Sequence, residues 1–274
     1  MTILFPTDFS PTAHNAYQYA IALAQDLGAR IDLMHVYSSS FKPTDLYLSV
    51  DETRKLRVQL QTEMQEKMED FCNHYTFTNI GDKLVYPAVF TDQEIVERTR
   101  KGADLVIMGT KGERNPINKL MGSVTTRLMM NAACPVLAIP QDAIYQGIKA
   151  ITYATSFTAN DKHFLEQLIN FGNKVAAEIS FLHVTDDLKI AVEEELSVPQ
   201  IPKQISKFFV VNNPSVMEGV DEFILEHPTD ILAMYVPKRG LWEQLFHVSF
   251  SKQMTFHTDT PLFVFHAPSG LIIN

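Results

Sequence analysis

The feature that most constrains this chain is an internal repeat, in which the second half follows the same order of apolar segments as the first. Segments 31–36 and 104–108 of the first half correspond to 179–184 and 230–234 of the second. Each is short, apolar and bounded by polar residues, which is typical of a buried strand. Because a structural unit used twice produces such a repeat, the 274 residues are expected to form two similar domains.

The spacing between equivalent positions changes once along the repeat. His35 and His183 are 148 residues apart, whereas Asp104 and Asp230 are 126 apart. The difference of 22 residues falls where the first half has a long helical pattern at 51–75. One apolar stripe follows this pattern and consists of Leu56, Leu60, Met64, Met68 and Phe71. We expect the second half to have lost or shortened this helix.

Helical patterns alternate with the apolar segments, which predicts parallel sheets built from right-handed βαβ units. Gly28 is expected to end the first helix. Strands of the first half are expected at 3–6, 31–36, 83–86, 104–108 and 135–139. The predicted fold class is α/β, with two tandem doubly wound domains, each a five-stranded parallel sheet of order 3-2-1-4-5 with flanking helices. We assign these domains to residues 1–143 and 147–274.

Composition excludes several classes of protein. The formal net charge is −9, which argues against a nucleic-acid partner. The two cysteines, Cys72 and Cys134, form no C-x-x-C pattern, so a disulfide framework or a zinc site is not expected. The sequence starts without a basic, apolar leader and has no apolar run of about 20 residues. A cytoplasmic protein that does not enter the membrane is therefore expected.

A spaced set of glycines follows the predicted strand 104–108 and precedes the helical pattern 124–130. It reads Gly109-x2-Gly112-x9-Gly122-Ser123. Main-chain N–H groups around Gly112 and at Gly122, Ser123 and Val124 are suited to hold phosphate, because glycine lets the backbone approach closely and a helix N-terminus attracts anions. We expect the Ser123 hydroxyl to cap the helix.

Three basic side chains lie within this loop, at Lys111, Arg114 and Lys119. They are placed to neutralise phosphate charge, although each is equally well explained as a solvent-facing residue.

Asp8 follows the first predicted strand, and Gly109 follows the fourth. In the order 3-2-1-4-5 these strands are neighbours, and ligands of such sheets bind beyond their carboxyl ends. The Asp8 carboxylate is suited to accept hydrogen bonds from a nucleoside or to meet a divalent ion, or it only caps the first helix or forms the turn before it. The main chain of Val36 could contact a base edge, and His35 either packs or binds the ligand.

The segments Pro6-Thr7-Asp8-Phe9-Ser10 and Gly109-x2-Gly112-x9-Gly122-Ser123 resemble the ATP-binding pattern of the universal stress proteins, specifically their tandem two-domain type. The resemblance implies that Asp8 and the backbone of Val36 contact the nucleoside. It implies that ribose and phosphates, with a bound Mg²⁺ or Mn²⁺, are held by Gly109, Gly112, Gly122, Ser123 and Val124. The predicted site is completed by the flanking residues Pro6, Thr7, Met108 and Lys111.

The second half departs from this pattern. The residues at the positions of Asp8, Gly109, Gly112 and Gly122 are Ser156, Tyr235, Lys238 and Val248, and only Ser249 keeps the identity of Ser123. Side chains at glycine positions fill the space that phosphate needs. The nucleotide is therefore expected in the first domain only.

The sequence thus predicts a cytoplasmic, ATP-binding stress-response or regulatory protein, with its two domains paired within the chain, a homodimer and an unidentified protein partner. It contains no P-loop pattern, no evident catalytic base and no cluster of metal ligands, so no catalytic or metal-ligating residue is assigned. The alternatives are a nucleotide-independent interaction module and a slow ATPase. A flavodoxin-like carrier is a more distant alternative, because no glycine follows the first strand.

Overall fold

A computed structural model describes the whole chain except residues 39–48, 111–120, 156–160, 187–204, 237–259 and 267–274. The strands are β1 (Thr2–Pro6), β2 (Arg30–Ser38), β3 (Ile80–Ala88), β4 (Leu105–Gly109), β5 (Val136–Ile139), β6 (Ala150–Ala154), β7 (Glu178–Thr185), β8 (Ile205–Asn212), β9 (Ile231–Val236) and β10 (Leu262–His266). The helices are α1 (Pro11–Leu27), α2 (Val50–Asn73), α3 (Thr91–Thr99), α4 (Ser123–Asn131), α5 (Asp161–Val175) and α7 (Val216–Glu226).

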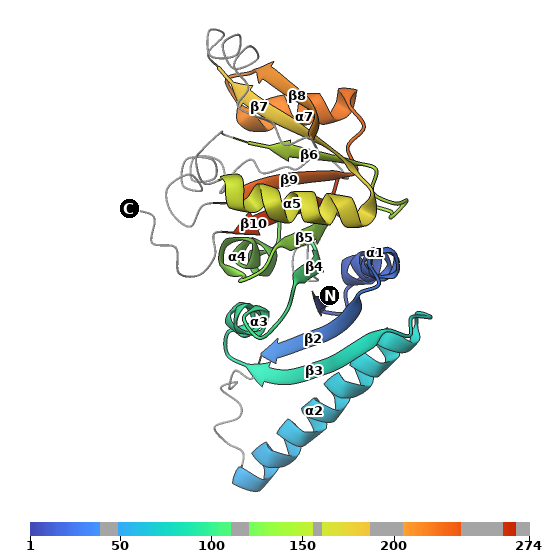
Figure 1. The fold of residues 1–274 in the computed structure, drawn as a ribbon. Helices are drawn as coiled ribbons and strands as arrows, with labels where there is room; N and C mark the ends of the chain where they lie inside the picture. The colour runs from blue at the N-terminus through green and yellow to red at the C-terminus, as the bar shows by residue number, and fades with distance from the viewer. Residues whose placement is uncertain (39–48, 111–120, 156–160, 187–204, 237–259, 267–274) are drawn as a thin grey trace.

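All these strands belong to one sheet, in the order β3-β2-β1-β4-β5-β10-β9-β6-β7-β8 (Figure 1). Pairing is parallel within the first five strands and within the last five, so each half has the order 3-2-1-4-5. The halves meet where β5 and β10 pair antiparallel, with Leu137 opposite Phe263. The predicted fold class is confirmed, and we refer to the two halves as the first and second units.

Helices cover both faces of the sheet. Alternate residues of β1 show how the faces divide, because Ile3 and Phe5 pack in one core and Leu4 packs in the other. The first core includes residues of α1, α2 and α5, and the second includes residues of α3, α4 and α7. Each core continues through both units, so the units share one three-layer architecture.

The ends of α1 follow from local chemistry. The Ser10 side chain accepts a hydrogen bond from the amide of Ala13 and caps the first turn. Gly28 follows the last turn with φ of 60°, a left-handed conformation that glycine adopts without strain. The prediction that Gly28 ends this helix is confirmed.

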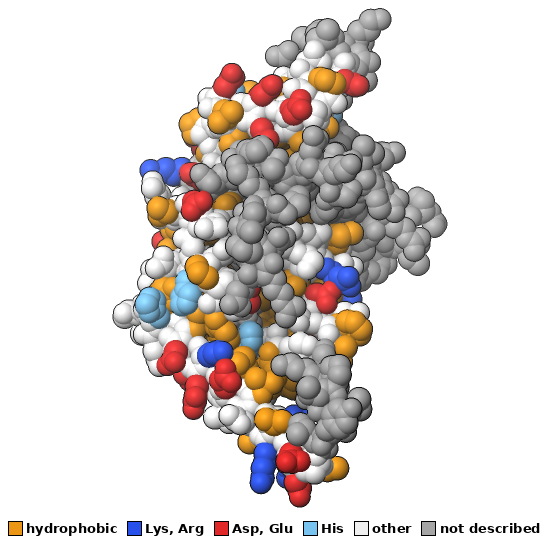
Figure 2. Space-filling view, turned by 180° about the vertical axis from the view of Figure 1, so that it is seen from behind, with side chains coloured by type: hydrophobic (Ala, Val, Ile, Leu, Met, Phe, Trp, Pro, Cys, Tyr) orange, Lys and Arg blue, Asp and Glu red, His pale blue; other side chains and the backbone are white. Residues whose placement is uncertain are grey.

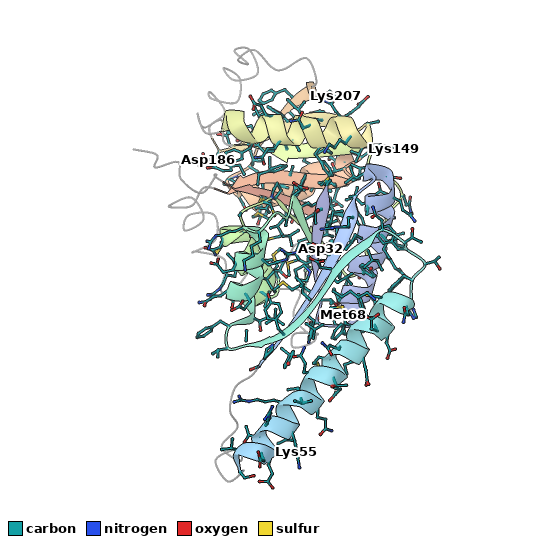
Figure 3. The ribbon with its side chains drawn as sticks, turned by 60° about the horizontal axis from the view of Figure 1, so that its bottom comes forward. Asp32, Lys55, Met68, Lys149, Asp186 and Lys207 are labelled. Carbon is teal, nitrogen blue, oxygen red and sulfur yellow. The ribbon has the colours of Figure 1, made fainter. Side chains whose placement is uncertain are left out.

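Helix α2 extends beyond the sheet that it packs against. Met64, Met68 and Phe71 are buried, whereas Leu56 and Leu60 are 50% and 37% exposed. Figure 3 shows Met68 beside the sheet and Lys55 near the far end of the helix. The apolar stripe is therefore buried only in its last three members, because the helical period continues past the surface available to cover it. Hydrophobic side chains also reach the surface in the lower, first-unit half of Figure 2.

The two units differ in length between their second and third strands. Residues 39–79 connect β2 to β3, whereas residues 186–204 connect β7 to β8. This is the place where the change in repeat spacing was expected. The predicted loss or shortening of the helix falls on residues 187–204, outside the described part of the chain.

The connection between the units, residues 140–149, contains no helix or strand. The Asn15 side chain on α1 donates hydrogen bonds to the carbonyl oxygens of Pro140 (3.2 Å) and Ala143 (3.0 Å). The Tyr145 hydroxyl donates to a carboxylate oxygen of Asp26. The first unit thus holds this connection on its surface, while the domain limits at 143 and 147 remain a prediction.

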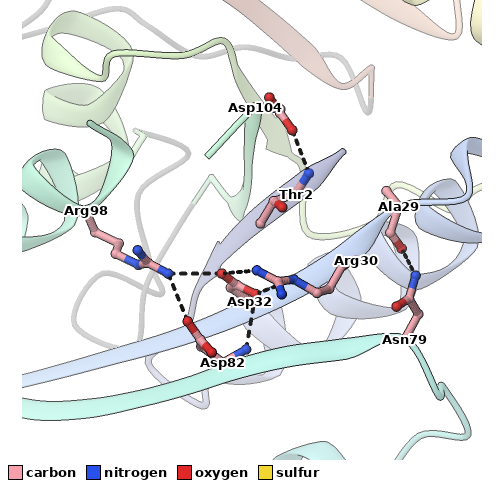
Figure 4. A network of polar contacts seen from close by, with 8 residues as sticks. All are labelled: Thr2, Ala29, Arg30, Asp32, Asn79, Asp82, Arg98 and Asp104. Atoms are coloured by element: carbon pink, nitrogen blue, oxygen red, sulfur yellow. Dashed lines mark hydrogen bonds and ion pairs between the residues drawn. The ribbon is translucent and has the colours of Figure 1, made fainter. Parts of the chain in front are cut away.

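A buried carboxylate ties α3 to the edge of the first unit (Figure 4). Asp32 on β2 is 2% exposed and pairs with the guanidinium groups of Arg30 (3.1 Å) and Arg98 (3.0 Å). It also accepts a hydrogen bond from the main-chain amide of Asp82 on β3. A Cβ atom at Gly81 would lie 2.1 Å from a carboxylate oxygen of Asp32, so this close approach requires glycine. The network therefore fixes the β2–β3 pairing and anchors α3.

Among the described residues, no helix combines the length and the apolar character needed to cross a bilayer.

Candidate functional site

The candidate site lies at the carboxyl end of β1, the central strand of the first unit, which has β2 and β3 on one side and β4 and β5 on the other. β1 pairs with β2 on one side, with Pro6 opposite Met34, and with β4 on the other, with Leu4 opposite Val106. Because the three strands are parallel, their carboxyl ends meet at one edge of the sheet. Asp8 and Gly109 therefore leave neighbouring strands at the same edge, as the predicted strand order requires.

The turn between β1 and α1 is held by its own side chains. The Phe9 amide donates to the Thr7 hydroxyl (3.0 Å), and the Ser10 amide donates to the Asp8 carboxylate (3.1 Å). Ser10 caps α1, so Asp8 shapes the turn without capping the helix. Phe9 has φ of 63°, which is unusual for a bulky residue. This turn presents the exposed Asp8 at the edge of the sheet.

His35 on β2 packs beneath this turn. Its Nδ1 lies 2.8 Å from the main-chain oxygen of Thr7, and its ring centroid is 4.3 Å from that of Phe9. Burial lowers the pKa of His35 below its ordinary value; the Thr7 hydrogen bond and the charge of Asp8 oppose this shift, and Lys67 adds to it. The sequence did not decide whether His35 packs or binds the ligand. The structure shows a hydrogen bond between His35 and the turn that carries Asp8.

The main chain of Val36 points toward the β1 side of β2 by strand geometry. The carbonyl of Met34 accepts a hydrogen bond from the Thr7 amide on the β1 side. Main-chain polar groups of a strand alternate in direction, so those of Val36 also point to the β1 side. They lie beyond Pro6, the last residue of β1 in the ladder. This position agrees with the predicted role of Val36 in contacting a base edge.

The carboxyl end of β4 is tied to the start of α4. The Gly122 amide donates to the oxygen of Thr110 (2.7 Å), and the Thr125 hydroxyl donates to the oxygen of Gly109 (3.0 Å). The second bond was not foreseen, although a threonine one turn into the helix was the available signal. Together these bonds set the direction in which α4 points its amino end.

Two expectations for this segment are wrong. Gly122 is the N-cap residue of α4 and Ser123 is its first helical residue, so the Ser123 hydroxyl does not cap the helix. The Gly122 amide is occupied by Thr110 and is not available to phosphate in this conformation. Within the described part of the chain no side chain caps α4, and the amides of Ser123 and Val124 lie in its first turn.

Several other predicted site residues can be placed. Pro6 is the last residue of β1, Thr7 is the buried first residue of the turn, and Met108 precedes Gly109 in β4 with 6% exposure. Lys111 and Gly112, with the loop residues Arg114 and Lys119, lie outside the described residues. The part of the chain that the structure describes contains no group of three or more side chains suited to hold a metal ion.

The second unit has the same histidine contact as the first, but it has a different residue at the position of Gly109. His183 Nδ1 lies 2.9 Å from the oxygen of Thr155, as His35 does from Thr7. At the position of Gly109, Tyr235 stacks on Phe164 with ring centroids 3.8 Å apart. The second unit therefore has an aromatic ring at a position where the first unit has no side chain. Ser156, Lys238, Val248 and Ser249 lie outside the described residues.

These features define a class: tandem doubly wound α/β proteins with a candidate ligand site at the topological switch point of the first unit. The model of the universal stress protein family matches residues 1–140. The chain belongs to this family.

Individual relatives cover one unit or both. Universal stress proteins MJ0577 and MJ0531 of Methanocaldococcus jannaschii are 29% and 30% identical over 150 and 142 residues, which is 50% of this chain and 93% and 80% of the relatives. The crystal structure of a universal stress protein from Archaeoglobus fulgidus covers 98% of this chain and 97% of its own, with a TM-score of 0.68 and 18% identity. A Pseudomonas aeruginosa protein of unknown function, PA1789, covers 97% and 92%, with a TM-score of 0.57 and 13% identity. These structures support the tandem fold.

Proposed function

We propose that this chain is a cytoplasmic stress-response protein that binds ATP, or a related adenine nucleotide, in the crevice of the first unit. The observation that carries the proposal is the convergence of two sets of main-chain groups on the β1–β4 switch point. One set belongs to Val36 at the end of β2, and the other to Ser123 and Val124 at the start of α4.

Each set matches one part of a nucleotide. Neighbouring N–H and C=O groups of a strand can pair with the edge of a base, and the Asp8 carboxylate can accept hydrogen bonds from the nucleoside. The amino end of α4, where Gly122 is the N-cap residue and supplies no side chain, favours the charge of the phosphates. A Mg²⁺ or Mn²⁺ ion bound through the phosphates belongs to the same proposal.

The second unit is proposed not to bind ATP in this way. The Tyr235 ring stands where the first unit has Gly109, and Val248 stands where it has Gly122. A homodimer and a protein partner are also part of the proposal. Because β5 and β10 pair with each other, a second copy would have to contact another surface.

Isothermal titration calorimetry with ATP and MgCl₂ tests the proposal. We expect one site per chain, and Gly122→Val is expected to weaken binding at least about tenfold by placing a side chain at the amino end of α4. The backbone at Gly122 (φ −63°, ψ 148°) is open to valine, and the second unit has valine at this position, so the fold should tolerate the change. Val248→Gly is the matched control and should leave affinity and stoichiometry unchanged.

Two outcomes would contradict the proposal. Two equivalent sites per chain would show that the second unit also binds. No binding at millimolar ATP would favour the nucleotide-independent interaction module. Release of phosphate that disappears in Gly122→Val would identify a slow ATPase at the same site.

A further inference from the structure

We propose that His35 is a positioning residue, which holds the Thr7–Phe9 turn in the shape that presents Asp8 to the ligand. The inference rests on the proposed function for its consequence in binding. Its structural basis is the hydrogen bond from the buried imidazole to the turn.

The direction of this hydrogen bond is settled by its chemistry. A carbonyl oxygen only accepts, so Nδ1 of His35 carries the proton and donates it to Thr7. His35 is 9% exposed, and a hydrogen bond at a buried position costs more to lose than one in water. The bond therefore joins β2 to the residue immediately before Asp8.

The ring cannot easily turn away from this position. Phe9 packs against it, and Tyr37 stacks on it with ring centroids 6.2 Å apart. The Tyr37 hydroxyl donates to the side-chain oxygen of Gln61 on α2, and the Gln61 amide donates to the oxygen of Val85 on β3 (2.9 Å). The imidazole thus has a fixed support on the side opposite the turn.

The turn needs such support because part of it is strained. Phe9 adopts φ of 63°, a left-handed conformation that is unfavourable for a residue with a Cβ atom. Two short-range bonds, from Phe9 to Thr7 and from Ser10 to Asp8, stabilise the turn internally. The bond from His35 is a second link between Thr7 and β2, beside the bond from the Thr7 amide to the oxygen of Met34, and it holds the carbonyl end of Thr7, which leads into the turn.

The second unit supplies an internal control. His183 makes the same bond to Thr155 at 2.9 Å, but the adjoining site contains Tyr235 in place of Gly109. Loss of this bond should disturb the second unit without affecting a ligand in the first. A change in nucleotide affinity that is specific to His35 therefore separates positioning from general destabilisation.

The first experiment needs no nucleotide. Hydrogen exchange measured by NMR on the full chain compares the wild type with His35→Leu and His35→Asn. Leucine removes the donor, whereas the asparagine amide places an N–H near the position of Nδ1. We expect the Phe9 and Ser10 amides to exchange about tenfold faster in His35→Leu, and His35→Asn to restore most of their protection.

The second experiment measures ATP affinity by calorimetry for the same proteins and for His183→Leu. We expect His35→Leu to weaken binding about tenfold, and His35→Asn and His183→Leu to stay within about twofold of the wild type. Unchanged exchange at Phe9 and Ser10 in His35→Leu would overturn the inference, as would equal weakening by His183→Leu. If the wild type binds no ATP, the proposed function fails, and the exchange experiment alone decides whether His35 positions the turn.

Discussion

Ala176 stands at the end of α5 where Gly28 stands at the end of α1, and both have a left-handed backbone, with φ of 56° and 60°. The hydrogen bonds around them match. Ala29 and Ala177, the next residues, donate their amides to the oxygens of Ala24 and Gly172 at 2.8 and 2.9 Å. The second unit therefore uses the same helix end without the residue that adopts it most easily.

Ala176→Gly is expected to raise the free energy of unfolding by about 1 kcal/mol, because it removes the strain of a Cβ atom at positive φ. The reciprocal change, Gly28→Ala, is expected to lower it by about the same amount. Urea denaturation followed by circular dichroism measures both. A loss of stability in Ala176→Gly would contradict the assignment of strain to this residue.

The Asp32 network should behave as a coupled unit. Gly81→Ala is expected to cost about 2 kcal/mol, because its Cβ would meet the Asp32 carboxylate at 2.1 Å. Asp32→Ala is expected to cost about 2 kcal/mol, because Arg98 then keeps only the exposed carboxylate of Asp82 as a partner. In a double-mutant cycle the cost of Gly81→Ala should fall by about 1 kcal/mol once Asp32 is alanine, because the other close neighbours of the added Cβ belong to the half-exposed side chain of Arg30. Additive costs would show that the two positions are independent.

Stability should decrease as the pH falls from about 7.5 to about 5.5. Burial holds the pKa of His35 below its ordinary value of 6.5, and burial and the neighbouring His74 also lower the pKa of His14. The unfolded chain therefore binds more protons than the folded chain below about pH 6.5, and stability is lost as the pH decreases. Urea denaturation at several pH values measures the slope. His35→Asn should reduce it, and an unchanged slope would show that His35 does not contribute.

Asn15→Ala is expected to destabilise the protein by about 1–2 kcal/mol, because two partly buried carbonyl oxygens of the interunit connection lose their donor. Asn15→Asp keeps the shape and places a carboxylate against the same oxygens, so its effect should be larger. Thermal denaturation compares the two variants. Equal stability of Asn15→Asp and the wild type would show that these hydrogen bonds do not hold the connection.

Local patterns were sufficient for most of the fold. Gly28 and the short apolar segments act through neighbouring residues, so the carboxyl end of α1 and the parallel strand order could be predicted. The sequence did not indicate that Leu56 and Leu60 on α2 are exposed, because helical periodicity reports which face is apolar and not how far the sheet extends beneath it.

The candidate site was predicted less completely than the fold. The sequence indicated Asp8, Val36 and the glycine positions, since these residue types have a local chemical meaning. It did not indicate that His35 contacts Thr7 or that Thr110 occupies the Gly122 amide. Such contacts join strands and turns that are distant in the chain, and no spacing rule specifies them.

The amino-acid sequence by itself determined the repeated α/β plan, the helix end at Gly28 and the loss of glycines from the second unit, because periodicity and backbone freedom are properties of short segments. Only the tertiary structure decided that β5 and β10 join the units in one sheet, that Asp32 is buried between Arg30 and Arg98, and that the Gly122 amide donates to Thr110. These depend on the packing of remote segments, where burial makes each unpaired polar group costly and so selects one arrangement.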